Sequence, residues 1–176
     1  MAIRNLDALF QPRSILIIGP EQIGAAALEQ FFTHFQRSGY KGRATLAGIT
    51  PPEGWSGGVV ASLEAFEGTV DLAVVLSGAN SAGAVLEALG ERGIKAALLI
   101  SRGFDEWPFF TTRQVLATAR RYGIRLIGPG SLGVISPHVG LDLSLAGRGV
   151  KKGDLALVSR SSAVINSTLA WAEKNG

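Results

Sequence analysis

Short apolar runs recur along the chain at intervals that suit the strands of a buried sheet. The most hydrophobic runs are rich in Ile, Val and Leu and lie at 14–18, 72–76, 96–100 and 154–158. Runs of this length and composition are typical of parallel strands that are buried on both faces. Weaker apolar runs, which also predict strands, lie at 44–47, 59–61 and 124–127.

Between these runs the apolar positions follow a helical period. The pattern predicts helices over 22–37, 81–92, 112–122 and 162–174. Strands and helices therefore alternate along the chain. This alternation predicts an α/β fold with a doubly wound parallel sheet.

The glycine-rich stretch 128–153 shows neither the apolar runs of the strands nor the helical period. It therefore predicts an irregular connection with one short hairpin. The residues after it add one strand, a turn and one helix, which are too few for a core of their own. We therefore predict a first domain over 1–130, a connection over 131–153, and the start of a second α/β domain over 154–176. Its apolar face favours self-association of the chain.

Composition narrows the class of protein. The chain has 176 residues, 47% of them hydrophobic, and a net charge of +3, which is typical of a folded, apolar-cored protein. Basic residues form only short groups at 120–125 and 151–152, so we expect a solvated surface and no nucleic-acid binding. Cysteine is absent, which excludes disulfides, thiolate metal sites and a cysteine nucleophile within this chain. We expect neither a signal peptide nor a membrane span, and a cytoplasmic location.

Ligands of open α/β sheets gather at the carboxyl ends of the strands, where backbone N–H groups and helix N-termini attract anions. Glycine- and hydroxyl-rich segments follow four predicted strands, and together they favour a ligand site over plain turns and helix caps. The residues expected to bind are Gly19, Pro20, Gln22, Ile23, Gly24, Thr50, Pro51, Ser77, Gly78, Asn80, Ser101, Arg102 and Gly103.

The first of these loops does not by itself identify the ligand. Its glycines stand at 19 and 24 only, which matches neither the dinucleotide fingerprint nor the P-loop. An NAD site also expects an acidic residue near the end of the second strand, and here the first carboxylate, Glu53, comes after two prolines. NAD is therefore disfavoured.

Catalytic groups are scarce. His34 lies among aromatic residues and is expected to pack or cap, while His138 is expected in a solvated loop. Residues 159–162, SRSS, suit either phosphate binding or N-capping. We find no convincing Ser-His-Asp arrangement, carboxylate pair or metal-ligand spacing, so we expect no metal and no catalytic residue in this chain.

Several stretches occur in an order that resembles a known family: LFQPRSILIIG, DLAVVL, ERGIKAALLISRGF, YGIRLIGPGSLGVISPHVGLDLSLA and KKGDLALVSRSSAVINSTLAWA. They resemble the CoA-binding domain of NDP-forming acyl-CoA synthetases, relatives of the succinyl-CoA ligase α subunit, over nearly the whole chain. The variants GPGSLG and SRSSAV are more similar to the branch fused to GNAT protein lysine acetyltransferases.

The resemblance implies a Rossmann-like domain that binds coenzyme A or acetyl-CoA through the four loops. The parent would be an ADP-forming acyl-CoA synthetase, or an acetyltransferase in which this domain binds or senses acetyl-CoA. Its partners would be CoA or an acyl-CoA and further C-terminal domains of the same chain, and this part would have no turnover of its own. Pro20, Glu21 and Glu53 depart from the family's usual phosphate-binding residues. The alternative is therefore an interaction or sensor domain that kept the fold and lost CoA.

Overall fold

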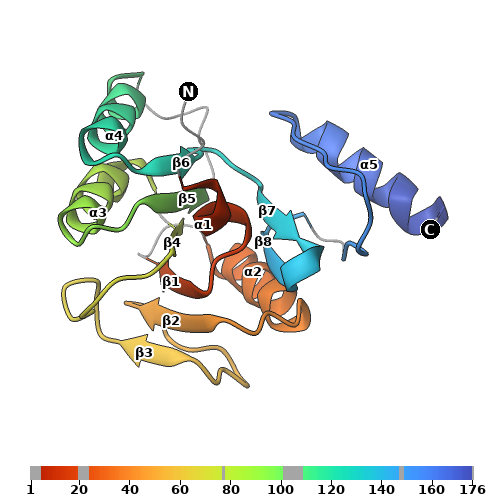
Figure 1. Cartoon of the computed structure of the whole chain (residues 1–176), viewed down its shortest axis with the longest axis horizontal. Coiled ribbons are helices and arrows are strands. Elements are labelled where there is room, and N and C mark those ends of the chain that lie inside the picture. Colours follow the sequence, from red (N-terminus) through yellow and green to blue (C-terminus); the bar gives the residue numbers. More distant parts are fainter. Residues whose placement is uncertain (1–4, 20–23, 77, 101–108, 147–148, 176) are drawn as a thin grey trace.

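A six-stranded parallel sheet forms the centre of the molecule (Figure 1). The computed structural model describes residues 5–19, 24–76, 78–100, 109–146 and 149–175. Within them the strands follow the order β3-β2-β1-β4-β5-β6. Their bounds are β1 (Ser14–Ile18), β2 (Arg43–Ala47), β3 (Gly58–Val60), β4 (Leu72–Leu76), β5 (Ala96–Ile100) and β6 (Arg125–Ile127). This order confirms the predicted doubly wound, Rossmann-like α/β fold.

Helices cover both faces of the sheet (Figure 1). One face carries α1 (Leu6–Phe10), α2 (Ala25–Arg37) and an antiparallel hairpin of β7 (Gly133–Ser136) and β8 (Leu141–Ser144), joined by the 3-10 helix η2 (Pro137–Val139). The other face carries α3 (Ala79–Glu91) and α4 (Phe109–Tyr122).

Alternate residues of the central strands supply the two halves of the core. In β1, Ile15 and Ile17 pack toward α2, whereas Leu16 and Ile18 pack toward α3 and α4. Every residue of β1, β4 and β5 is buried, as expected for strands covered on both sides. Because each large apolar side chain contributes about 1.5 to 3 kcal/mol on burial, these strands fix the frame that carries the loops.

The hairpin packs onto α2 through two side chains that lie one helical turn apart. Gln30 donates a hydrogen bond from Nε2 to the carbonyl of Leu145 at 3.2 Å. His34 Nδ1 lies 3.0 Å from the carbonyl oxygen of Ser144, and this acceptor fixes the proton on Nδ1. The prediction of a packing histidine is confirmed, and so is the short hairpin within 128–153.

Most predicted elements are confirmed. The strands at 14–18, 72–76 and 96–100 have the predicted bounds, and the three weaker strands are correct to within one residue at each end. The predicted strand at 154–158 is wrong, because these residues have no regular secondary structure and lie outside both described sheets. A strand requires a neighbour for its backbone hydrogen bonds, and no described segment pairs with this one.

The last helix, α5 (Ser162–Asn175), lies apart from the sheet (Figure 1) and buries none of its described residues. The irregular segment before it is also exposed, with 82% of Leu155 and 93% of Val158 accessible to solvent. The predicted domain boundaries and self-association stay predictions. In the described parts of the chain, no helix has both the length and the apolar character needed to cross a membrane.

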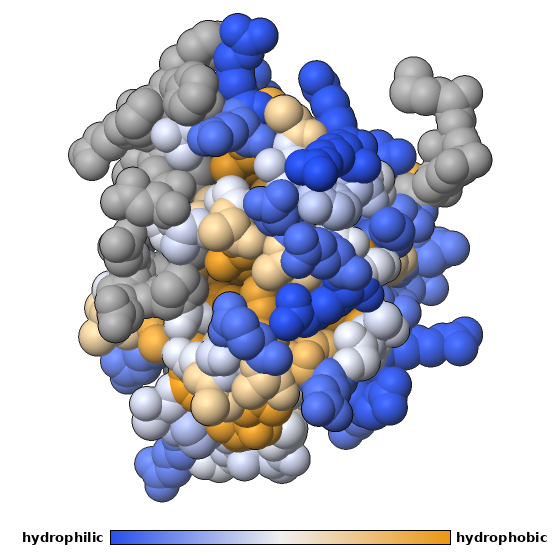
Figure 2. All heavy atoms as spheres, turned by 90° about the vertical axis from the view of Figure 1, so that its left-hand side faces the viewer, coloured by the Kyte–Doolittle hydropathy of each residue, from blue (hydrophilic) through white to orange (hydrophobic). Residues whose placement is uncertain are grey.

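The side of the molecule that carries α3 and α4 mixes polar and apolar surface. Figure 2 shows a central band of hydrophobic side chains bordered by hydrophilic ones on this side. Leu116 of α4 and Val59 of the edge strand β3 are among the exposed large apolar residues of the chain. Exposed apolar residues of this kind are normal on folded proteins.

Candidate functional site

The carboxyl ends of β1, β2 and β4 lie side by side, because β1 pairs with β2 on one side and with β4 on the other. The chain leaves β1 for α2 on one face and leaves β4 for α3 on the opposite face. The strand order thus reverses direction next to β1. Such a switch point at the carboxyl edge is the usual ligand position in open α/β sheets.

Two helices begin at this edge on glycine caps. Gly24 is the N-cap of α2, with φ of 82°, and Gly78 is the N-cap of α3. Among the described residues, no side chain makes a hydrogen bond at either cap, and neither helix has an acidic residue in its first turn. The first-turn N–H groups and the positive dipole ends are therefore available to an anion from two sides of the sheet.

Gly19, directly after β1, is in close contact with the loop that follows β2. A Cβ placed on Gly19 would lie 2.6 Å from Cδ1 and Cγ1 of Ile49, which is far inside normal carbon contact. Gly19 N also donates to the carbonyl of Ala47 at 3.4 Å. The first two candidate loops therefore share one packed contact, and a side chain at position 19 would require the outer atoms of Ile49 to move.

The connection from β2 to β3 contains no helix and is held against α2 by side chains. Gln36 Nε2 donates to the carbonyl of Glu53 at 2.9 Å. The Trp55 ring lies 5.9 Å, centroid to centroid, from both Phe32 and Phe35, and its Nε1 donates to the carbonyl of Gly58 at 3.2 Å. These contacts fix the loop that carries Thr50 and Pro51.

The segment after β6 reaches the same edge. Gly128 has φ of 97°, and a Cβ there would lie 2.3 Å from the carbonyl oxygen of Leu99 in β5. Gly128 thus allows the segment 128–130 to lie directly against the end of β5. This segment is a further candidate to contact a ligand at the carboxyl edge.

The structure describes part of the predicted site. Gly19, Thr50, Pro51 and Gly78 follow neighbouring strands. Gly24 is the N-cap of α2, and Asn80 lies in the first turn of α3. Pro20, Gln22, Ile23, Ser77, Ser101, Arg102 and Gly103 lie outside the described residues. Sequence reasoning missed Ile49 as a contact of Gly19. The one indication of this contact in the sequence is that Ile49 is an apolar residue between Gly48 and Thr50.

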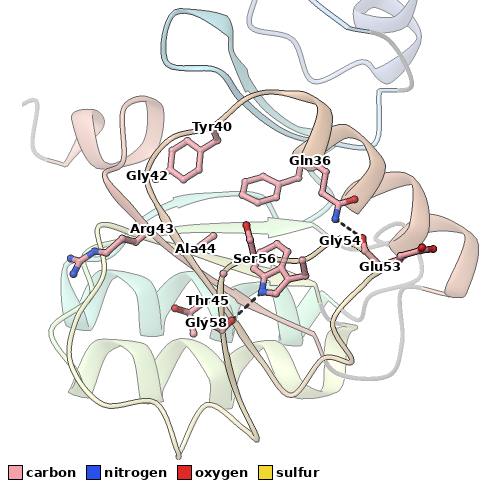
Figure 3. A pocket seen from close by; sticks show the side chains of 13 residues that line it. Gln36, Tyr40, Gly42, Arg43, Ala44, Thr45, Glu53, Gly54, Ser56 and Gly58 are labelled. Carbon is pink, nitrogen blue, oxygen red and sulfur yellow. Dashed lines mark hydrogen bonds between the residues drawn. The ribbon is translucent and has the colours of Figure 1, made fainter.

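A cavity of about 680 Å³ lies elsewhere, between α2, the start of β2 and the β2–β3 connection (Figure 3). Its lining includes Phe35, Tyr40, Arg43 and Trp55. Because Arg43 begins β2, this cavity belongs to the amino half of the strand and not to the carboxyl edge. No group of three or more metal-binding side chains was found among the described residues.

A buried carboxylate lies where the hairpin packs against α2. Asp142 accepts a hydrogen bond from Ser144 Oγ at 2.7 Å, and Ser144 Oγ accepts one from Ala146 N at 3.3 Å. Burial raises the pKa of the Asp142 carboxyl, while the Ser144 hydroxyl and then the nearby His34 oppose that rise. The ionised carboxylate therefore weakens this packing at neutral pH.

We expect Asp142→Asn to retain or raise the stability at pH 7. A carboxyl whose pKa is raised in the folded state favours folding below its unfolded pKa, and this contribution is lost as pH rises through the folded pKa. Asn keeps an acceptor for Ser144, so the gain should not exceed about 1 kcal/mol. Thermal unfolding between pH 3 and pH 7 measures it, with exposed Asp154→Asn as control. A variant clearly less stable at pH 7 would contradict the prediction.

Comparison with known proteins identifies relatives. A family model described as "CoA binding domain" matches residues 13–137. The chain is 32% identical, over an alignment 178 positions long, to the α subunit of acetate–CoA ligase (ADP-forming) I from Pyrococcus furiosus, covering 95% of this chain and 38% of that subunit. It is 36% identical over 104 residues to acetate–CoA ligase (ADP-forming) from Methanocaldococcus jannaschii, covering 58% of this chain and 15% of that protein.

A solved structure has the same fold. The apo form of the dinucleotide-forming acetyl-coenzyme A synthetase 1 from Ca. Korarchaeum cryptofilum superposes with a TM-score of 0.81 at 22% identity, over 97% of this chain and 38% of that one. The present chain therefore spans little more than a third of the P. furiosus subunit and of this synthetase. From the match over residues 13–137 we conclude that the chain belongs to the CoA-binding domain family.

Proposed function

We propose that this chain binds coenzyme A or acetyl-CoA at the carboxyl edge of its sheet, as one part of a larger ADP-forming acyl-CoA synthetase or a synthetase-like protein. The observation that carries the proposal is the pair of helix N-termini, α2 and α3, which begin beside β1 and have no side-chain cap among the described residues. Family membership and the ADP-forming ligases among the relatives support CoA as the ligand.

The residues of this edge fit a phosphorylated, extended ligand. Backbone N–H groups after Gly24 and Gly78 would bind its pyrophosphate, and the exposed Thr50 hydroxyl would supply a further hydrogen bond. Gly19 and Gly128 carry no side chain that would hold the ligand away from the strand ends. Binding and orientation, without chemistry, are what these groups provide, so turnover would need other domains.

The proposed binding has two finer forms. In a synthetase, the domain would present the CoA thiol to a reaction carried out by other domains. In a synthetase-like protein fused to a GNAT acetyltransferase, it would bind acetyl-CoA as a regulator, which the variants GPGSLG and SRSSAV favour. An interaction domain without CoA is the contrasting candidate, favoured by the exposed carboxylate of Glu53 near the loop, because a negative charge there opposes phosphate.

Calorimetry with CoA, acetyl-CoA and NAD tests the proposal. We expect CoA or acetyl-CoA to bind with Kd between micromolar and millimolar, which corresponds to roughly −8 to −4 kcal/mol. NAD should give no comparable signal, because no carboxylate follows β2 directly. NAD binding tighter than CoA would refute the ligand, and the absence of any CoA signal would favour the interaction domain.

A further inference from the structure

Three cationic residues lie near the amino ends of β1 and β2, on the edge of the sheet opposite to the proposed CoA site. Arg13, Lys41 and Arg43 line one depression of about 510 Å³, together with residues that include Tyr40 and Val139. All three cations are exposed. Arg43 also lines the adjoining cavity of Figure 3.

Strand pairing brings these cations together from distant parts of the sequence. In the β1–β2 register, Ser14 lies opposite Arg43. The backbone N–H of Arg43 donates to the carbonyl of Arg13 at 2.9 Å. Because neighbouring strands lie about 4.8 Å apart, the two arginines start from adjacent backbone positions. Lys41 is two residues before Arg43, in the turn that enters β2.

No carboxylate lies among the residues that line this depression. The nearby Asp71 directs its Oδ2 at other partners: the N–H of Arg13 at 2.8 Å, the N–H of Ser14 at 3.0 Å and the Ser14 hydroxyl at 3.2 Å. Within the described residues, the ion pair found is Arg121–Glu87, in α4 and α3. Within the part of the chain that the structure describes, no salt bridge within 4 Å involves any of the three cations.

Tyr40, which lines the depression together with the three cations, is held in place and uncharged. Tyr40 donates its hydroxyl to the carbonyl of Pro12 at 2.9 Å. Burial, and then the charge of Asp71, raise the pKa of Tyr40 to about 12, so the phenol stays neutral and adds no negative charge. Phe35 packs against the Tyr40 ring at 5.8 Å between centroids. The depression thus combines three cationic residues with a fixed, neutral Tyr40 side chain.

From this geometry we propose that the depression lined by Arg13, Lys41 and Arg43 is a second anion site that takes a ligand carrying two or more linked phosphate groups. Two guanidinium groups can each bind phosphate oxygens in a bidentate manner, and Lys41 adds a point charge. A single phosphate would neutralise these three charges incompletely. The site is separate from the strand ends where CoA is expected, and it does not depend on the proposed function.

Inorganic pyrophosphate is the probe that tests this site. Its binding to the full chain is measured by calorimetry at low and at physiological salt, next to orthophosphate. The test variant is Arg13→Gln/Arg43→Gln, which leaves every backbone hydrogen bond available. The matched control is Lys151→Gln/Lys152→Gln, which removes the same charge from exposed residues elsewhere. Thermal unfolding checks that both variants fold.

We expect the arginine variant to lose at least about tenfold in pyrophosphate affinity, or 1.4 kcal/mol, and the lysine control less than twofold. CoA affinity should be the same in both, because neither pair lies at the carboxyl edge. Equal losses in the two variants would indicate only a general charge effect and overturn the proposal. So would a parent chain that does not bind pyrophosphate, orthophosphate binding as tight as pyrophosphate, or displacement of all bound pyrophosphate by CoA.

Discussion

Gly128→Ala is expected to destabilise the fold by about 2 to 6 kcal/mol. The added Cβ would lie 2.3 Å from the carbonyl oxygen of Leu99, and the residue would keep a φ of 97°. Overpacking of this kind costs about 1 to 3 kcal/mol, and a strained backbone conformation adds about 1 to 3 kcal/mol. Leu99 belongs to the fully buried strand β5, so its backbone has no room to move away.

Urea unfolding measures this cost, with Gly68→Ala as matched control. Gly68 has a φ of 102°, close to that of Gly128, but a Cβ there would meet nothing within 4 Å. The control therefore carries the backbone cost alone. The difference between the two variants isolates the contact with Leu99. Equal destabilisation would show that the close approach of residues 128–130 to β5 does not constrain the fold.

The sequence predicted the sheet well because the burial of its central strands leaves a strong local signal. β1, β4 and β5 are apolar at every position or nearly so, and each of their residues is buried. The run at 154–158 has the same local signal, yet it forms no strand. An apolar run indicates that a segment tends to be buried. To form a strand, the segment also needs a neighbouring strand to pair with, and a local sequence pattern does not show whether one is present.

The sequence allowed us to predict which loops form the candidate site, but not which residues contact one another there. Gly19 and Gly78 follow apolar runs, and in a parallel sheet every such position reaches the same edge. The contact of Ile49 with Gly19 depends on how one loop crosses another. The cluster of Arg13 with Lys41 and Arg43 depends on strand register. The sequence pattern indicated only the basic groups that are contiguous in the chain, at 120–125 and 151–152. The cations that line the depression are different residues.

Gly19→Ala is expected to weaken CoA binding by about tenfold, because the new methyl group would occupy the place of the Ile49 side chain. Its Cβ would lie 2.6 Å from two Ile49 carbons, while Ile49 itself is buried in the core cluster beneath α2. The outer atoms of Ile49 must then move, and because Ile49 is packed in the core we expect the neighbouring loop with Thr50 and Pro51 to move with it. A loss of tenfold corresponds to 1.4 kcal/mol of binding free energy.

A double-mutant cycle separates this mechanism from a general loss of stability. Ile49→Ala removes both carbons that the Gly19→Ala methyl group would meet, so the double variant should recover CoA affinity relative to Gly19→Ala alone. Calorimetry with CoA measures the affinities and thermal unfolding the stabilities, and we expect a coupling of about 0.5 to 3 kcal/mol in stability. Gly83→Ala is the control, because a Cβ on this glycine of α3 meets nothing within 4 Å. Strictly additive effects of the two substitutions would show that the Gly19–Ile49 contact does not position the loop, and an unchanged affinity in Gly19→Ala would place the ligand away from the end of β1.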